Sequence, residues 1–313
     1  MKDVSFYHAW PDKEALYDYE PTLFHLRDHL ILQCASGWNC YYAVNDKNGK
    51  IVASLSININ GKKGNTAVRS PYGGIECSSG LSAETLYEFI RFIDGHLADT
   101  VDEAVIKFPP EAYAPRSQAM SFSFLHALGF TSSNADLSSC ITVSGNFVDV
   151  LRKTEEQVLN KALEAGLTAS VMPGNKLHDA YSFIANHHNR KGYPMSMTWN
   201  QLEETTKLFP GRYLAFAVHS KEELIGAAIA VRVSSSVLSL FYIDHDSQAD
   251  KLSPPVLLIA SLYDYCSTNH IPLLDLGTSS LQEGPNISLL SFKMRMGARP
   301  SVKPTLRKVY THG

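Results

Sequence analysis

Two stretches of the chain show the same pattern of apolar runs separated by a polar turn. Residues 40–57, CYYAVNDKNGKIVASLSI, place β-branched and aromatic runs on either side of an Asn/Asp/Gly turn, which is typical of a β-hairpin. Residues 213–231, YLAFAVHSKEELIGAAIAV, repeat this layout. A third extended run follows each hairpin, at residues 66–72 and 237–243. The pattern predicts two three-stranded antiparallel meanders.

The segments that follow the two meanders also correspond. Each contains an apolar stripe at three-to-four spacing, a short apolar strand, a helix that stops at a glycine, and a last strand. The glycines, Gly129 and Gly297, stand where a left-handed C-cap is favoured. The chain therefore contains a duplicated unit. We predict these elements near residues 86–97, 103–108, 124–129 and 139–144 in the first copy, and near 256–266, 273–277, 291–297 and 306–310 in the second.

Helices are predicted between the two copies. Residues 154–167 open with Thr-x-x-Gln and residues 198–209 open with Thr-Trp-Asn-Gln, both in capping-box form. We place the boundary near residues 145–152. The predicted domains are residues 1–150 and residues 151–313, the second consisting of a helical connector and the second copy.

Composition fits this division and narrows the class of protein. A chain of 313 residues with 44% hydrophobic and 19% charged residues has room for two globular domains. The net charge of -3 argues against an extended basic surface, so we expect no DNA partner. The longest apolar run, residues 256–263, is far shorter than the ~20 residues that cross a bilayer. We expect no membrane span.

Cysteine usage and the N-terminal residues bear on the compartment. The five cysteines are scattered, odd in number and without a CxxC pair, which favours reduced thiols over a disulfide framework. The first twenty residues contain acidic residues and a proline where a signal peptide would need an apolar segment. We therefore expect a cytoplasmic protein.

The order of elements resembles the GNAT acyltransferase fold, and the tandem arrangement with inserted helices resembles its FemAB-like branch, which includes peptidoglycan aminoacyltransferases. The resemblance covers residues 38–310 and implies an α/β (α+β) fold of two tandem GNAT-like mixed-sheet domains. It also implies an enzyme, an acyl or aminoacyl transferase acting on an amine of a peptide or sugar precursor. The motifs that carry it are SPYGGI at 70–75, the Tyr113 segment leading to FLHALGF at 124–130, NKALEAGL at 160–167, DLGTSS at 275–280 and SFKMRMGA at 291–298.

The acyl donor stays open. GNAT domains that use acetyl-CoA have a glycine-rich loop before a helix, whose bare N–H groups hold pyrophosphate. The matching residues 245–256 contain no glycine and end in Pro254 and Pro255, which lack an N–H, and residues 75–84 contain only Gly80. We expect no bound cofactor, and a donor that is acetyl-CoA, another acyl-CoA or aminoacyl-tRNA. The alternatives are an acetyl-CoA-dependent N-acetyltransferase with an atypical phosphate loop and a non-catalytic binding module.

Three residues are predicted to be catalytic. Acyl transfer needs a positive or hydrogen-bonding group where the carbonyl oxygen becomes anionic, and Lys293 resembles the lysine of the family's Phe-Lys element. The first copy has Leu125 there, so we predict that the second copy holds the reaction centre. Asp275, after two leucines on a strand, is costly unless paired, and Tyr242 ends the last meander strand. The structural alternatives are a helix-end charge, a turn cap and an exposed strand end.

Other residues are predicted to bind the substrate, a small-molecule or peptide amine. Tyr72 and Gly73 belong to SPYGG, which is either a tight turn or a loop that lines the substrate. Asp244 lies at the same strand end as Tyr242. The stretch HHNRKGYP at 187–194 has donors for a carboxylate or phosphate, although a helix dipole alone also favours cations there. From it we predict Arg190, Lys191 and Tyr193.

No metal is predicted. His25 and His29 share one helical face but lack the glutamate of an HExxH motif. The sequence also shows no G-x-S-x-G nucleophile motif.

Overall fold

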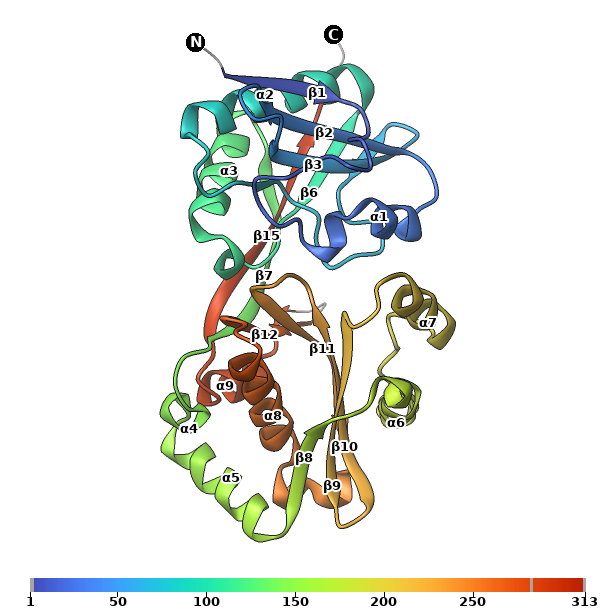
Figure 1. Ribbon diagram of the computed structural model, residues 1–313, viewed down its shortest axis with the longest axis vertical. Helices are drawn as coiled ribbons and strands as arrows, with labels where there is room; N and C mark the ends of the chain where they lie inside the picture. The colour runs from blue at the N-terminus through green and yellow to red at the C-terminus, as the bar shows by residue number, and fades with distance from the viewer. Residues whose placement is uncertain (1–2, 282–283, 312–313) are drawn as a thin grey trace. The chain divides into compact units, whose positions relative to one another are not determined.

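The computed structural model describes residues 3–281 and 284–311 (Figure 1). The chain forms two compact units, Met1–Asp136 with Ser301–Gly313 (unit 1) and Leu137–Pro300 (unit 2). Each unit has a mixed sheet, helices and its own apolar core. The predicted fold class of two mixed-sheet α/β domains is confirmed.

The sheet of unit 1 has the strand order β1-β2-β3-β4-β6-β15. The β4–β6 pair is parallel and the other pairs are antiparallel. A short strand, β5, pairs with β3 outside this order. The strands are β1 (Val4–His8), β2 (Trp38–Asn45), β3 (Ile51–Asn60), β4 (Lys63–Asn65), β5 (Glu76–Cys77), β6 (Glu103–Lys107) and β15 (Arg299–Val309).

The long helix of unit 1 forms where the apolar period predicts it. In α2 (Ala83–Thr100) the N-cap Ser82 accepts a hydrogen bond from the N–H of Thr85, and five apolar residues at helical spacing are buried. Helix α3 (Pro115–Ala127) packs beside α2, and the short α1 (Arg27–Gln33) precedes β2. Gly129 follows α3 with φ +91°, the conformation predicted for its C-cap.

The sheet of unit 2 has the order β7-β12-β11-β10-β9-β8. Only the β11–β12 pair is parallel. Strand β7 begins in unit 1, and its residues 138–142 pair with β12. The strands are β7 (Thr131–Thr142), β8 (Leu167–Val171), β9 (Tyr213–Ser220), β10 (Glu223–Arg232), β11 (Val237–His245) and β12 (Leu273–Thr278), and a separate hairpin consists of β13 (Ser280–Leu281) and β14 (Gly284–Pro285).

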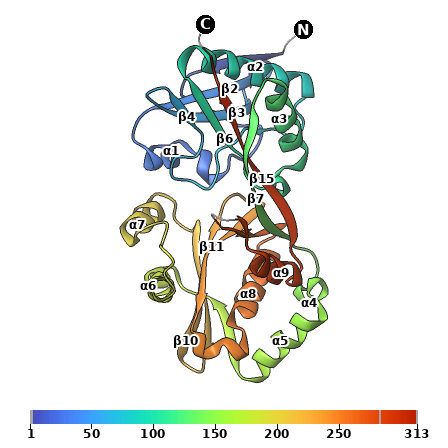
Figure 2. The same ribbon diagram turned by 180° about the vertical axis from the view of Figure 1, so that it is seen from behind.

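Helices cover both faces of the unit 2 sheet. Helix α8 (Pro254–Thr268) packs across β8 to β12, whereas α6 (Leu177–Arg190) packs on the opposite face against β9, β10 and β11 (Figures 1 and 2). The remaining helices of this unit are α4 (Phe147–Val150), α5 (Lys153–Glu164), α7 (Trp199–Leu208) and α9 (Ile287–Arg295).

Most predicted elements are present, with two local corrections. Residues 66–72 are not a strand, because the Asn65 side chain accepts the N–H of Ala67 and turns the chain after the three residues of β4. The capping box at Thr198 with Gln201 is confirmed. The one predicted at Thr154 is wrong, since α5 begins at Lys153 with Arg152 as its N-cap.

The last strand of each predicted copy pairs within the other compact unit. Strand β15 pairs with β6 of unit 1, and residues 138–142 of β7 pair with β12 of unit 2. The two compact units therefore consist of other residue ranges than the predicted domains, 1–150 and 151–313. Strands β7 and β15 have 12 and 11 residues, and the chain passes from one unit to the other within both.

Candidate active site

Lys293 is buried in α9 and its amine reaches the end of β12. The N-cap of the helix is Asn286, whose side chain accepts the N–H of Leu289, and Gly297 follows the helix with φ +86°. Lys293 is only 5% exposed, and its Nζ donates to the carbonyl oxygens of Gly277 and Thr278, both at 2.9 Å. An ammonium has three N–H donors, so one remains beyond these two bonds to described residues.

The environment of Lys293 sets its charge. Burial lowers the pKa of Lys293 to about 8, while the negative charge of Asp275 opposes the shift. The amine is therefore mostly protonated at neutral pH, and it is a stronger acid than a surface lysine.

Asp275 is buried near Lys293, and several neighbouring polar groups donate hydrogen bonds to it. Its Oδ1 accepts the Ser138 hydroxyl at 2.6 Å and the N–H of Gly277 at 2.8 Å. The hydroxyl of Ser239 lies 3.3 Å from Oδ2, and the thiol of Cys140 lies 3.7 Å from Oδ1. Burial, together with Asp275, raises the pKa of Cys140, so this thiol stays protonated. The carboxylate is thus hydrogen-bonded, as a buried charge requires.

The strands β11 and β12 stop pairing at the level of Asp275. The last pair is Ser239 with Asp275, and the β7–β12 register shifts between Asp275 and Thr278. Gly277 lies within this shift with φ +75°, where an L side chain is strained. On β11, Phe241 is the extra residue of a bulge against β10. Both strands are thus irregular beyond their last shared pair.

Tyr242 fixes a loop in the structure. Its hydroxyl lies 2.5 Å from the Ser196 hydroxyl and accepts the N–H of Met197 at 2.9 Å. Burial raises the pKa of Tyr242, which keeps the phenol neutral. This side chain therefore positions the chain that leads into α7.

Asp244 and Lys191 form a second polar cluster, between β11 and the end of α6. Lys191 Nζ donates to Asp244 Oδ1 at 2.5 Å. The Nε2 of His188 lies 3.7 Å from Asp244 Oδ2, and its Nδ1 is buried without a hydrogen-bond partner among the described residues. Arg190 is exposed and Tyr193 is 61% exposed. Of the predicted binding group, Lys191 is paired with a carboxylate, whereas Arg190 and Tyr193 face solvent.

Tyr72 and Gly73 lie in unit 1, in a tightly packed loop. The ring of Tyr72 is 2% exposed and packs edge-on against Phe24 and Tyr113. A Cβ on Gly73 would lie 1.9 Å from the carbonyl oxygen of Thr66, so no other residue fits. These contacts favour the tight-turn interpretation of SPYGG.

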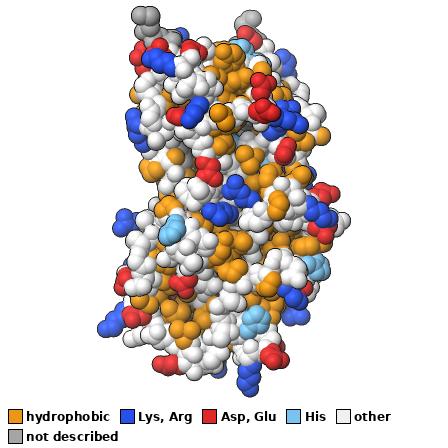
Figure 3. Space-filling model, viewed as in Figure 1, with side chains coloured by type: hydrophobic (Ala, Val, Ile, Leu, Met, Phe, Trp, Pro, Cys, Tyr) orange, Lys and Arg blue, Asp and Glu red, His pale blue; other side chains and the backbone are white. Residues whose placement is uncertain are grey.

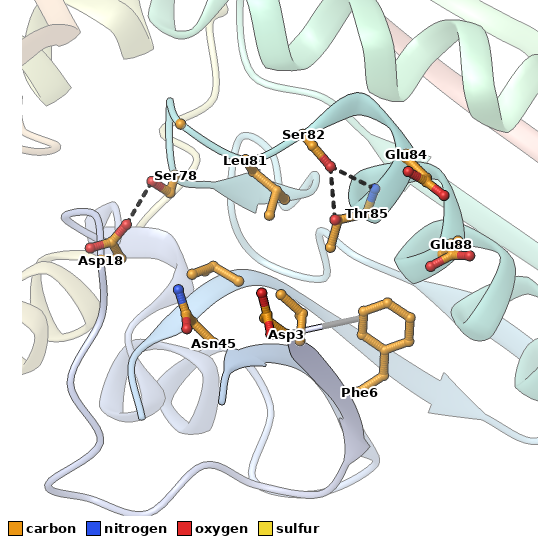
Figure 4. Close-up of a pocket in the computed structure, with 13 residues that line it drawn as sticks. Asp3, Phe6, Asp18, Asn45, Ser78, Leu81, Ser82, Glu84, Thr85 and Glu88 are labelled. Atoms are coloured by element: carbon orange, nitrogen blue, oxygen red, sulfur yellow. Dashed lines mark hydrogen bonds between the residues drawn. The ribbon is translucent and has the colours of Figure 1, made fainter. Parts of the chain in front are cut away.

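Unit 1 has an acidic pocket at the start of α2. Figure 4 shows the side chains of Asp3, Asp18, Glu84 and Glu88 around it, with Asn45 and several hydroxyl groups. Among the residues that the structure describes, its lining includes no lysine, arginine or histidine. Carboxylates at a helix N-terminus repel phosphate, so this pocket does not fit the pyrophosphate of coenzyme A.

The corresponding helix start in unit 2 also lacks a phosphate cradle. Helix α8 begins with Pro254 and Pro255, and its N-cap Ser253 makes no side-chain capping bond. Two of the helix-start N–H groups that usually bind phosphate are therefore missing. The segment before it contributes the carboxylates of Asp246 and Asp250.

Lys and Arg side chains are interspersed with Asp and Glu on the face shown in Figure 3.

No helix within residues 3–281 and 284–311 is long and apolar enough to cross a membrane. Within the same residues, no group of three His, Cys, Asp or Glu is arranged to hold a metal ion.

Several site residues are absent from the sequence-based prediction. Ser138 and Cys140 come from β7, far from Asp275 along the chain, and no local pattern indicates that they meet. His188 was predicted only as part of a cationic helix end. Gly277 takes part through its backbone N–H and carbonyl oxygen, and only the presence of a glycine at this position hints at that role.

The fold was compared with known proteins. No family model and no curated protein sequence matches the chain. FemX matches with a TM-score of 0.68 and 12% identity, over 93% of this chain and 94% of FemX. The fold is therefore the tandem GNAT fold of the FemAB-like kind.

Two further structures are similar in fold. The C-terminal domain of a putative lysylphosphatidylglycerol synthetase from Agrobacterium fabrum has a TM-score of 0.54 at 10% identity, over 82% of this chain and 80% of that one. L-PGS from Bacillus licheniformis has a TM-score of 0.52 at 12% identity, with the same coverage. These neighbours share the fold of this chain.

Proposed function

We propose that the protein is an acyl or aminoacyl transferase that acylates an amine, with its reaction centre at the end of β12 in unit 2. The observation that carries the proposal is the buried ammonium of Lys293, fixed by two carbonyl oxygens where β11 and β12 no longer pair.

The chemistry requires stabilisation of one developing charge. The amine nitrogen attacks the donor carbonyl carbon, a C–N bond forms, and the carbonyl oxygen becomes anionic. The third N–H of Lys293 is suited to that oxygen, because the other two already hold the ammonium in place. When the intermediate collapses, the bond to the leaving oxygen or sulfur breaks. The proton lost by the amine balances the proton gained by the leaving group.

Asp275 acts as a positioning residue in this proposal. It holds the N–H of Gly277, while Lys293 holds the carbonyl of the same residue. Its negative charge also favours the protonated form of Lys293, which would otherwise lose its proton more readily in a buried site. The carboxylate thus supports the charge and the place of the ammonium.

An aminoacyl ester, as in aminoacyl-tRNA, is the donor that we propose first. The acidic pocket at α2 and the two prolines of α8 both disfavour the pyrophosphate of coenzyme A. One neighbour is named a putative lysylphosphatidylglycerol synthetase, so its named product carries a lysyl group, which supports the same choice. Net charge -3 and the mixed surface charges favour contact with a short part of a tRNA only.

The proposed acceptor is an amine on a small molecule or peptide that also carries an anionic group. Arg190 and Tyr193 are the predicted binding residues that remain accessible. Lys191 is engaged by Asp244 and is better suited to orienting the end of α6.

The test is a donor screen with matched variants. Total tRNA charged with labelled amino acids and labelled acetyl-CoA are each offered with a lysine-containing peptide and with a nucleotide-linked sugar peptide. We expect label on an acceptor from aminoacyl-tRNA, and its loss in Lys293→Met but not in Lys161→Met. Transfer from acetyl-CoA alone would select the N-acetyltransferase alternative. No transfer and no thermal stabilisation by either donor would favour a binding module.

A further inference from the structure

Unit 2 has an apolar groove bounded by α4, α5, β8 and α8. Its floor includes the buried side chains of Phe147, Leu159 and Leu257. Large apolar side chains also line it at the surface, including Leu163 at 52% exposure and Val171 at 41%. The groove has a volume of about 630 Å³. Exposed apolar side chains gathered around one hollow are typical of a surface that binds a partner.

The strand at one side of this groove has a free edge. Strand β8 pairs only with β9 among the strands of the described chain. Met172 donates its N–H to Ala215 at 2.8 Å, so the antiparallel alternation turns the backbone groups of Ser170 toward β9 and those of Ala169 and Val171 outward. Strand β8 contains no lysine or proline of the kind that usually protects such an edge.

The free edge and the groove coincide at the same two residues. Ala169 and Val171 line the groove with their side chains, while their outward backbone groups lie along the edge. An extended segment that pairs with β8 would therefore place alternate side chains in the groove.

The charge in the groove points to the chemistry of that segment. Within the described part of the chain, Asp264, on α8, is the only charged residue in the lining, and no ion pair with it is found there. Asp264 is exposed, so a cation on a bound segment can reach its carboxylate. A lysine or arginine on the bound segment would supply the missing counter-charge. A second copy of this chain would bring another Asp264 and a like charge.

We infer that this groove and the edge of β8 bind an extended peptide segment of a partner protein, with apolar residues at alternate positions and one Lys or Arg that faces Asp264. The partner adds a strand to the sheet of unit 2. This inference is independent of the proposed acyl transfer, because it uses neither Lys293 nor the end of β12.

Selection of a phage-displayed random heptapeptide library on the full chain tests the inference. We expect enriched peptides with alternating aliphatic residues and one basic residue. A selected peptide is then made with a fluorophore, and its affinity is measured by anisotropy. Leu163→Ser should weaken binding about tenfold or more, since a leucine contact in the groove is lost. Asp264→Asn should weaken it about threefold, the size of an exposed ion pair.

The controls separate strand addition from general stickiness. Leu208→Ser, on α7, removes a leucine that is also 52% exposed and should leave the affinity unchanged. The same peptide N-methylated at its inward-facing amides should bind about tenfold or more weakly. The inference is overturned if no peptide is enriched, or if Leu163→Ser binds like the parent chain. Binding of the N-methylated peptide as tightly as the unmodified one also overturns the inference. So does the finding that the chain binds no peptide but forms a dimer that Leu163→Ser abolishes.

Discussion

The Nζ of Lys293 lies 2.9 Å from the carbonyl oxygen of Gly277. The N–H of that same glycine donates to Asp275 at 2.8 Å. The two charged side chains thus hold one residue from both sides, at the point where β12 leaves its partner β11. This arrangement gives Lys293 a fixed place, and among the described residues it leaves one N–H of the ammonium beyond the two bonds to carbonyl oxygens.

Activity is expected to depend on the protonation of Lys293. Burial lowers its pKa to about 8, so the cation is present below that pH and is lost above it. We predict that kcat falls as pH rises through about 8. In Lys293→Arg the guanidinium stays charged, so any remaining activity should persist to higher pH. A wild-type kcat that keeps the same value from pH 7 to 10 would separate the reaction from this amine.

Asp275→Asn is expected to shift the same pH profile. Asparagine retains an acceptor for Ser138 and Gly277 but removes the charge that favours protonated Lys293. We predict that the alkaline fall in kcat moves to lower pH. Asp179→Asn, at an exposed ion pair on α6, is the control and should not move it. An unchanged profile in Asp275→Asn would show that the carboxylate has only a packing role.

Tyr242→Phe is expected to loosen the chain before α7. The variant loses the bonds to Ser196 and Met197, at a cost of about 1 kcal/mol for a typical hydrogen bond. Amide exchange at Met197 should speed up, and the acceptor KM should rise more than kcat falls. Tyr265→Phe serves as the matched control in the same unit. A loss of kcat without faster exchange would instead assign chemistry to the phenol.

Glu76 makes the stability of unit 1 depend on pH. Burial raises the pKa of Glu76 to about 8, and burial lowers the pKa of His25 to about 3, so the nearby histidine supplies no charge. The folded state therefore keeps a proton that the unfolded state loses from about pH 4.5 upward. The contribution of Glu76 to stability is greatest below that pH and decreases as pH rises, until the folded state also ionises near pH 8. The buried His25 has the opposite effect below about pH 6.5, because the unfolded state binds a proton there that the folded ring does not.

Urea unfolding of Glu76→Gln at pH 5.5 and pH 9 tests this linkage. A Trp199→Phe background confines tryptophan fluorescence to unit 1, where Trp10 and Trp38 lie. We expect the ionisation of Glu76 to lower the unfolding free energy of the parent at pH 9 relative to pH 5.5. The loss is about 1.4 kcal/mol for each unit of the Glu76 pKa shift that lies between these two pH values. The Glu76→Gln chain should lose much less. Equal losses in both chains would place the pH dependence in other groups.

Sequence periodicity was sufficient for most of the fold. Local alternation predicts the hairpins at residues 40–57 and 213–231, and helical spacing predicts α2 and α8. Both patterns can be recognised within a single element of the sequence. Strands β1 and β8 were missed because five residues with little alternation give a weak pattern. The pairing of β7 with β12 and that of β15 with β6 were missed, because strand partners are set by long-range packing.

The site was predictable in part for the same reason. Lys293 and Asp275 lie on neighbouring elements of one repeat, and the difference between Lys293 and Leu125 marked the second copy. The partners of Asp275 on β7 and β11 depend on sheet register, which the sequence pattern leaves open. The pairing of Lys191 with Asp244 was also missed, because α6 was treated as a connector rather than as a layer on the sheet.

The most direct test of the account is kcat for Lys293→Met in the transfer assay, with the fold checked by thermal unfolding. Methionine keeps the length and helix propensity of lysine but removes the ammonium. Lys161→Met is the control, because Lys161 is also a helical lysine that donates to a backbone carbonyl, on an exposed surface. We predict that kcat falls by ~10²–10³ in Lys293→Met, as for the loss of an oxyanion donor, and changes little in Lys161→Met. A folded Lys293→Met protein with kcat within about threefold of the parent, well short of that oxyanion-type loss, would contradict the proposed role of Lys293.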